Sequence, residues 1–343
     1  MKFDVVIGNP PYQEDGFGEN TRGEPIYHLF MDESYKVAKK VSLITPGRFL
    51  FNVGQTPSQW NEKMLQDNHL KVVYYEQNSS KVFMNTDIKG GIAITYRDIE
   101  KNFGAIETFT HFEELRTILQ KVGNSKKFIP ISNIIHSSMS YKFSNTLYED
   151  KPEIRELSSQ NSGNSIRTNA FDRLSILFHD NQPDDGEEYV RIFGRQNNGR
   201  THKWIAKKYI EHHPNLTKYK VILPKSNGTG ALGEVLSSPI IAEPLTGHTQ
   251  TYISIGEFNN LFEAESTLKY IKTKFTRIML GVLKITQDNQ RKVWAKVPLQ
   301  DFTPNSDIDW TKSIAEIDQQ LNKKYELNED EIAFIESNVK EME

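Results

Sequence analysis

The chain of 343 residues is 37% hydrophobic and 25% charged, which suits a folded protein of two domains and excludes a disordered one. Its mean hydropathy is −0.59 and no apolar run approaches the ~20 residues that span a bilayer, so we expect neither a membrane segment nor a signal peptide. Cysteine is absent, which excludes disulfides and is typical of a cytoplasmic protein, while the formal net charge of −3 argues at first against a nucleic-acid partner.

The first hundred residues alternate strand and helix patterns. The apolar run Phe3–Ile7 predicts a fully buried parallel strand, and Pro25 opens a helix in which apolar residues recur at helical spacing. Three more strands are predicted at Val41–Thr45, Lys71–Glu76 and Gly91–Tyr96, and a second helix follows Pro57 and runs to Asn68. This order predicts a parallel sheet that is covered by helices.

From about residue 115 the pattern is looser, with short strands between loops that are rich in Ser, Asn and Gly. Helices are predicted over roughly Asn260–Lys274, Ser313–Leu321 and Asn328–Val339. We therefore predict an α/β protein, with a first domain over residues 1–114 and a second, α+β domain over residues 115–343.

Charge is distributed unevenly along the second domain. Arg191–Gly230 holds nine basic residues against Glu211 and carries +8, Ser266–Lys296 carries +7, and Asp301–Glu343 carries −8. The basic segments include aromatic side chains that could stack on bases, namely Trp204, Tyr209, Tyr219, Phe275 and Trp294. A phosphate-binding face and an ordinary solvated face explain the charges equally well.

The strongest chemical signal is Asn9-Pro10-Pro11-Tyr12, directly after the first strand. Residues just past the carboxyl end of a parallel strand face the ligand crevice. The two prolines keep the backbone extended and leave the Pro10 carbonyl without a local amide partner, so Asn9 and this carbonyl would accept both N–H bonds of an exocyclic amino group. Tyr12 would stack on the base. The alternative is a rigid Pro-Pro turn, but the apolar strand, Asn9 and Tyr12 around it favour a functional site.

Ile7–Tyr12 resembles the catalytic motif of N6-adenine DNA methyltransferases. The helix that begins Ile26–Phe30 and the segment Val41–Leu50 resemble the next two motifs, and Val82-Phe83 with Asp87–Ile92 resembles the segment before the last catalytic hairpin. Four later segments resemble the recognition region of bacterial restriction–modification adenine methylases (type II, often nuclease-fused): Thr249–Tyr252, Lys284–Gln287, Val297–Phe302 and Glu329–Lys340.

The resemblance implies transfer of a methyl group from S-adenosylmethionine to adenine N6 in double-stranded DNA, with the target base flipped out. The catalytic residues would be Asn9, Pro10, Pro11 and Tyr12. Asn9 and the Pro10 carbonyl would accept hydrogen bonds from the amino group, and Tyr12 would offset part of the cost of unstacking the base. This chemistry requires no metal and no covalent nucleophile.

One departure from the family concerns the cofactor. The family places a glycine-rich motif upstream of the catalytic motif, whereas eight residues precede Asn9 here. We therefore expect the C-terminal half of a Rossmann-like sheet, in a truncated or split form that binds S-adenosylmethionine weakly or not at all, and we assign no cofactor-binding residue. Phe3–Ile7 would then be an exposed apolar edge, which an upstream half-domain or a second copy of the chain would cover.

Two further patterns have weaker interpretations. Gly228–Gly233 spells G-x-G-x-x-G, but the residues that follow leave room for one helical turn before Pro239, so we interpret it as a DNA-contacting loop or, alternatively, a plain flexible loop. The histidines show no metal-ligand spacing, so contacts with solvent or phosphate are expected for those in the second domain, which include His179, His202, His212, His213 and His248.

Two hypotheses follow. The first is a site-specific N6-adenine DNA methyltransferase fragment whose second domain recognises the target, and the second is a non-catalytic DNA-recognition module that retains the pocket. A small-molecule α/β enzyme would require tight DNA binding to be absent. The residues predicted to contact DNA are Arg195, Arg200, Lys225, Lys284 and Arg291.

Overall fold

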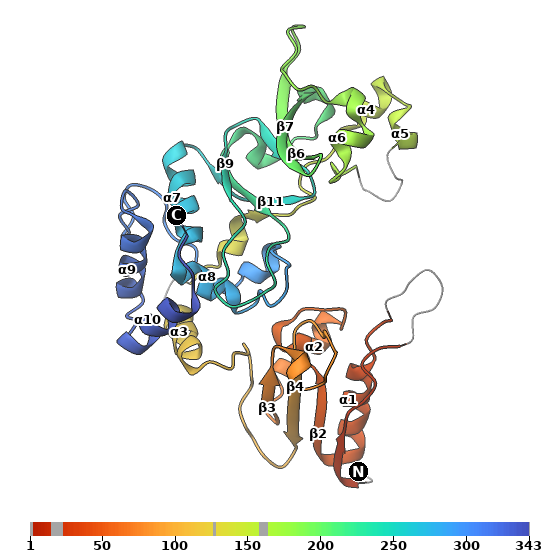
Figure 1. The fold of residues 1–343 in the computed structure, drawn as a ribbon, viewed down its shortest axis with the longest axis vertical. Helices are drawn as coiled ribbons and strands as arrows, with labels where there is room; N and C mark the ends of the chain where they lie inside the picture. Colours follow the sequence, from red (N-terminus) through yellow and green to blue (C-terminus); the bar gives the residue numbers. More distant parts are fainter. Residues whose placement is uncertain (1–2, 15–22, 126–127, 158–163, 343) are drawn as a thin grey trace. The chain divides into compact units, whose positions relative to one another are not determined.

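The computed structural model describes residues 3–14, 23–125, 128–157 and 164–342. The chain forms two compact units, residues 1–113 (unit 1) and 114–343 (unit 2) (Figure 1). Each unit contains buried hydrophobic side chains that form its core. Helices and strands are mixed in both units, so the predicted α/β class is confirmed.

Unit 1 is built on one four-stranded sheet with the strand order β1-β2-β4-β3. Its elements in chain order are β1 (Phe3–Gly8), α1 (Tyr27–Val37), β2 (Ala38–Pro46), the 3₁₀ helix η1 (Gly47–Phe51), α2 (Ser58–Leu65), β3 (Leu70–Glu76), η2 (Ser79–Lys81) and β4 (Ile92–Asp98). These strands and helices confirm the elements predicted for this part of the sequence.

The orientation of one strand differs from the prediction. β1 and β2 run parallel, but β4 runs antiparallel to both β2 and β3, so a wholly parallel sheet is wrong for this chain. A parallel crossover normally needs a helix of its own, and the connection from β3 to β4 contains only the short η2. That connection therefore closes a hairpin.

β1 is exposed, which corrects the prediction of a fully buried strand and agrees with the expectation of an exposed apolar edge. Phe3 is 58%, Val5 51% and Ile7 79% exposed. β1 lies at the end of the sheet and pairs on one side only, with β2, among the described residues. The apolar run has the composition of a buried strand but lacks a neighbour, and an unpaired apolar edge favours association with another chain.

The core of unit 1 lies where α1, η1 and α2 meet the sheet. Tyr27 and Met31 form the buried side of α1, and the Tyr27 ring packs against Phe49 and Trp60 at centroid distances of 6.4 and 6.3 Å. These aromatic contacts fasten the start of α1 to the residues that follow β2.

Unit 2 contains a three-stranded sheet, β10-β6-β7, and a four-stranded sheet, β5-β11-β8-β9. The strands are β5 (Ile135–His136), β6 (Tyr189–Gln196), β7 (Gly199–Ala206), β8 (Tyr219–Pro224), β9 (Ile240–Ala242), β10 (Thr246–His248) and β11 (Tyr252–Phe258). The α-helices are α3 (Glu113–Gly123), α4 (Asn145–Asp150), α5 (Ile154–Leu157), α6 (Ala170–Arg173), α7 (Leu261–Lys272), α8 (Lys274–Gly281), α9 (Ile314–Lys324) and α10 (Glu329–Asn338).

Three of these helices confirm predictions: α7, α9 and α10. α9 and α10 each begin with a capping box, in which the side chain of Ser313 or Asn328 accepts from the backbone three residues on. Two aromatic residues correct the list of base-stacking candidates. Phe275 and Trp294 are fully buried, and the indole N–H of Trp294 donates to the Asn289 carbonyl at 3.1 Å.

His248 is also buried, which corrects the expectation that it contacts solvent or phosphate. Its side chain is 0% exposed, its Nδ1 donates to the Thr249 carbonyl at 3.0 Å, and its Nε2 lies 3.3 Å from the Ser254 hydroxyl. The Asn215 amide donates to that same hydroxyl and accepts from Tyr141. These bonds satisfy a polar network inside the unit, where an unpaired group would be costly.

Because of burial, the pKa of His248 is lowered from 6.5 to about 3. The unfolded chain takes up a proton as the pH falls through 6.5, but the folded chain does not until about pH 3, so the unfolding free energy should decrease as the pH falls between these values. His248→Gln should make this decrease shallower by about 1.4 kcal/mol per pH unit. Urea unfolding at pH 6 and pH 5 measures the change in unfolding free energy between these pH values. The substitution His212→Gln, of an exposed residue, is the control. An unchanged slope in His248→Gln would contradict the burial of a neutral imidazole.

Candidate functional site

The loops that carry the predicted catalytic motif and its neighbours meet at one edge of the sheet in unit 1. β1 and β2 are parallel, so their carboxyl ends lie at the same edge. β3 also ends there and β4 begins there, because Ile92 pairs with both Pro46 and Glu76. Residues 9–14, 47–57 and 77–91 therefore converge, as expected for an α/β sheet.

The Asn9–Tyr12 segment leaves β1 and is fastened to the start of α1. The Tyr12 carbonyl accepts from the Ile26 N–H at 3.2 Å, and Gln13 pairs with Pro25. Asn9 is exposed, and Tyr12 is half-buried. Neither the Asn9 side chain nor the Pro10 carbonyl forms a hydrogen bond with another described residue.

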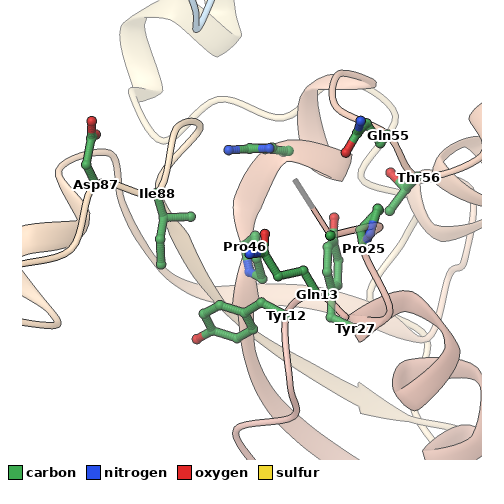
Figure 2. A pocket seen from close by; sticks show the side chains of 11 residues that line it. Tyr12, Gln13, Pro25, Tyr27, Pro46, Gln55, Thr56, Asp87 and Ile88 are labelled. Carbon is green, nitrogen blue, oxygen red and sulfur yellow. The ribbon is translucent and has the colours of Figure 1, made fainter. Parts of the chain in front are cut away.

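A cavity of about 370 Å³ opens beside Tyr12. Figure 2 shows Asp87 and Ile88 on one side of this pocket and Gln55 and Thr56 on the other, with Tyr12 between them. The complete lining is Tyr12, Gln13, Gly23, Pro25, Tyr27, Pro46, Arg48, Gln55, Thr56, Asp87 and Ile88. Two tyrosines, an arginine and several amide and hydroxyl groups suit a flat, polar-edged aromatic ligand.

Burial raises the pKa of the Tyr12 hydroxyl, and it raises that of Tyr27 to about 12. Both rings therefore stay neutral at physiological pH. The Tyr12 hydroxyl is buried and has no hydrogen-bond partner among the described residues. It is thus an unused polar group on the wall of the pocket.

Two of the loops are locked together behind the pocket. The Gly47 N–H donates to the Gly91 carbonyl at 2.9 Å, and the Arg48 guanidinium donates to the Lys89 carbonyl. Gly91 has φ +69°, and a Cβ atom there would lie 2.4 Å from the Glu76 carbonyl oxygen. Glycine is therefore required at this close approach of the loop before β4 to the end of β3.

Gln55 and Thr56 line the pocket, although no motif in the sequence indicates it. After η1 the chain turns back through Asn52 and Gly54, which both have positive φ, and this turn brings Gln55 and Thr56 to the pocket. The Thr56 hydroxyl donates to the Asn61 side chain at 2.7 Å, which fastens the turn to α2. The Asn–x–Gly pattern at 52–54 was the one available signal of this turn.

Gly91→Ala should lower the unfolding free energy of the chain by more than ~2 kcal/mol, because it adds a clash with Glu76 to the cost of a positive φ. Gly104→Ala is the matched control, since Gly104 has φ +79° but nothing within 4 Å of the added Cβ. Denaturant unfolding of both variants separates the clash from the backbone strain. Equal losses in the two variants would show that the loop before β4 is not tightly packed against β3.

In unit 2, two predicted DNA-contacting residues face each other across a β-hairpin. Arg195 of β6 pairs with Arg200 of β7, and the turn between them passes through Asn197 and Asn198, both with positive φ. Arg195 donates to the Asn198 carbonyl at 2.9 Å. Arg195 and Arg200 are exposed, so their remaining N–H groups are available to phosphate.

A chain of hydrogen bonds connects this hairpin with Lys225. Arg200 donates to the carbonyls of Ser237 and Ser238, and the Ser237 N–H donates to the Asn227 side chain at 2.6 Å. Lys225 lies two residues before Asn227, and its backbone N–H donates to the Thr251 carbonyl. The structure therefore brings Arg195, Arg200 and Lys225 into one connected region.

Arg291 belongs to the same region, but Lys284 does not present its charge there. The Lys225 carbonyl accepts from the Asn289 N–H at 2.9 Å, two residues before the exposed Arg291. The Lys284 side chain is 2% exposed and forms an ion pair with Glu234 inside the unit. A phosphate contact by Lys284 as predicted would require this buried pair to open, so we do not retain Lys284 as a DNA contact.

Several other basic side chains of Arg191–Gly230 are neutralised by acids outside that segment. Arg191 pairs with Glu243 at 2.7 Å, Lys207 pairs with Glu188 at 2.7 Å, and three further pairs are Lys203–Asp180, Lys208–Glu187 and Lys208–Asp150. The formal charge of +8 for Arg191–Gly230 therefore overstates the positive charge of this surface. Across the described part of the chain, no group of three or more His, Asp or Glu side chains is arranged to hold a metal ion, and no helix is long and apolar enough to cross a membrane.

Residues 1–83 match the Eco57I restriction-modification methylase family. They include the Asn9–Tyr12 motif and the two motifs after it, so the predicted resemblance is confirmed for this part of the chain. A protein of Mycoplasma pneumoniae (strain ATCC 29342 / M129 / Subtype 1), described as an uncharacterized adenine-specific methylase, is 30% identical over 95 residues, which are 27% of this chain and 22% of that protein. The matched region thus spans about a fifth of that relative.

Two solved structures resemble the chain at low sequence identity. One is the type IIG restriction endonuclease BpuSI, with 11% identity, 94% of this chain and 48% of that chain covered, and a TM-score of 0.32. The other is the type IIL restriction-modification enzyme MmeI in complex with DNA, with 8% identity, 98% and 56% covered, and a TM-score of 0.42. TM-scores below 0.5 do not establish a shared function.

Proposed function

We propose that the chain provides the target-base pocket and the DNA-contacting domain of a site-specific N6-adenine DNA methyltransferase of a restriction–modification system. S-adenosylmethionine would be the methyl donor of the complete enzyme. One observation carries the proposal. In the segment that matches the methylase family, Tyr12 lines the pocket, and the Asn9 side chain and the Pro10 carbonyl, which precede it and do not line the pocket, have no hydrogen-bond partner among the described residues.

The pocket suits an adenine that has left the DNA stack. The amino group of adenine has two N–H bonds, which match the Asn9 amide oxygen and the Pro10 carbonyl. Acceptors fixed in advance favour the positive charge that develops on this nitrogen when it is alkylated. Pro11 holds the two acceptors rigid, and the Tyr12 ring offers a face on which the base stacks.

We expect the described residues to form only part of a site for S-adenosylmethionine. In a Rossmann-like sheet an acidic side chain binds the ribose. Among the residues that line the pocket the acid is Asp87, and its carboxylate is paired with Lys89 at 2.8 Å. We therefore assign no cofactor-binding residue and expect weak or no binding of S-adenosylmethionine by this chain alone.

The exposed edge of β1 supports a partner in unit 1. The outer edge of β1 has unpaired backbone groups among the described residues, with which an additional strand would pair, and Phe3, Val5 and Ile7 are exposed on one face of β1, which an element connected to that strand would cover. This strand would come from an upstream methyltransferase half or from a second copy of the chain. The rival hypothesis, a DNA-recognition module without catalysis, is favoured by the incomplete cofactor site and predicts DNA binding without methyl transfer.

Asn9→Ala should lower methyl transfer to duplex DNA by 10²- to 10³-fold, because it removes one acceptor for the developing charge. The assay uses labelled S-adenosylmethionine, with the chain alone and with a polypeptide that supplies the upstream glycine-rich motif. Gln59→Ala, an exposed residue of α2, is the control and should retain full activity. DNA binding with no methyl transfer under either condition would favour the recognition module.

Neutralising a residue that contacts phosphate should reduce the salt dependence of DNA binding by about one unit of slope. We expect this for Arg195→Ala, Arg200→Ala, Lys225→Ala and Arg291→Ala, measured by titration of duplex DNA at several salt concentrations. Lys323→Ala, an exposed lysine of α9, should leave the slope unchanged. A slope that none of the four substitutions alters would contradict the proposed surface.

A further inference from the structure

A buried ion pair lies beneath the proposed DNA surface of unit 2. The Lys284 ammonium contacts the Glu234 carboxylate and also donates to the carbonyls of Asn227 at 2.7 Å and Thr286 at 3.2 Å. The Lys284 side chain is 2% and the Glu234 side chain 16% exposed. Glu234 and Asn227 belong to the connection between β8 and β9, so the lysine ties this connection to the segment that follows α8.

Glu234 also folds that connection around its own carboxylate. The N–H groups of Thr229 and Gly230 donate to it at 2.8 and 3.2 Å. Gly228 has φ +63°, and a Cβ atom there would lie 2.1 Å from a Glu234 carboxylate oxygen. The positive φ and the nearby carboxylate explain the first glycine of the G-x-G-x-x-G sequence without a nucleotide, and Gly230 and Gly233 also have positive φ and lie close to Ile285 and Asn338.

The pair contributes more to the choice of one conformation than to stability. Removing two charges from water costs about as much as their attraction returns, and an apolar pair of similar size often packs as well. The connection between β8 and β9 is long and contains no helix or strand, so it has many alternative conformations. Lys284 and Glu234 select the one in which the Asn227 N–H donates to the Gln287 carbonyl at 2.8 Å.

The selected conformation controls how the proposed DNA contacts are presented. Ser226 forms a bridge with Asp288 directly after Lys225, and the Asn227 side chain holds the Ser237 N–H. Ser237 in turn supplies a carbonyl that orients Arg200. The same ion pair thus underlies the positions of Lys225 and of the Arg200 guanidinium.

We propose that the Lys284–Glu234 ion pair is a positioning device that preforms the phosphate-contacting surface carried by Lys225 and Arg200. The inference rests on the proposed DNA binding. Ordering a flexible surface on binding costs free energy and weakens affinity. Because the ion pair orders this surface in the free protein, it increases the affinity for DNA without contacting DNA.

Two variants break the device in different ways. Glu234→Gln removes the charge but keeps the shape of the side chain, and Gly228→Ala leaves both charges but forces the loop away from the carboxylate. Glu336→Gln is the matched control, since it breaks the ion pair of the half-buried Lys274 with Glu336, between α8 and α10. The measurements are affinity for duplex DNA, the unfolding midpoint, and hydrogen exchange of the backbone amides.

We expect both test variants to bind DNA at least 10-fold more weakly and to lose exchange protection at Thr229 and Gly230. Protection in β8 and β11 should stay at the wild-type level, and Glu336→Gln should bind like the wild type. Unchanged affinity in both variants would overturn the inference. It would also be overturned by loss of protection throughout unit 2, which would make the pair a general structural element. A wild-type chain that does not bind DNA would instead refute the proposed function itself.

Discussion

The parallel pairing of β1 with β2 is the constraint on which the candidate site of unit 1 depends. Two parallel neighbours end at the same edge, so the Asn9–Tyr12 segment after β1 and the Gly47–Arg48 turn after β2 must meet. The antiparallel β4 brings a third loop to this edge, and the hydrogen bond from Gly47 to Gly91 locks it there. The pocket is thus a product of strand direction, and its walls come from segments that are distant in the sequence.

In the segment Arg191–Gly230, acids among the described residues pair with three lysines and with Arg191 but not with Arg195 and Arg200. Lys203, Lys207 and Lys208 all pair with acids, whereas Arg195 and Arg200 bond only to backbone carbonyls among the described contacts. A backbone carbonyl orients a guanidinium group without cancelling its charge. The other N–H groups of the guanidinium can still donate to a planar anion. The net charge of −3 is therefore a poor guide to this surface, and so is the +8 of the segment. The distribution of partners decides which cations remain.

Periodic patterns predicted the strands and helices of unit 1 and three helices of unit 2, because such patterns depend on neighbours along the chain. The direction of β4 was not predictable in this way, since it depends on whether the connection after β3 forms a helix. Burial of single polar residues was equally inaccessible. His248 and Lys284 look like surface residues in the sequence, and they are buried because Ser254 and Glu234 lie opposite them in the fold. The Asn9–Tyr12 segment was recognisable because its chemistry is local, whereas Thr56 joins the pocket through a turn with positive φ.

The proposed acceptor Asn9 lies next to the exposed strand β1. Asn9 follows β1 directly, its side chain is exposed, and the apolar edge of β1 is exposed beside it. Hydrogen bonds to a developing charge are strong only where water is excluded, because bulk water screens them. An additional strand would pair with the free edge of β1, and an element packed on the exposed face of β1 would bury Phe3, Val5 and Ile7. In the proposed enzyme, covering β1 would therefore also exclude water from the neighbouring acceptor for the adenine amino group.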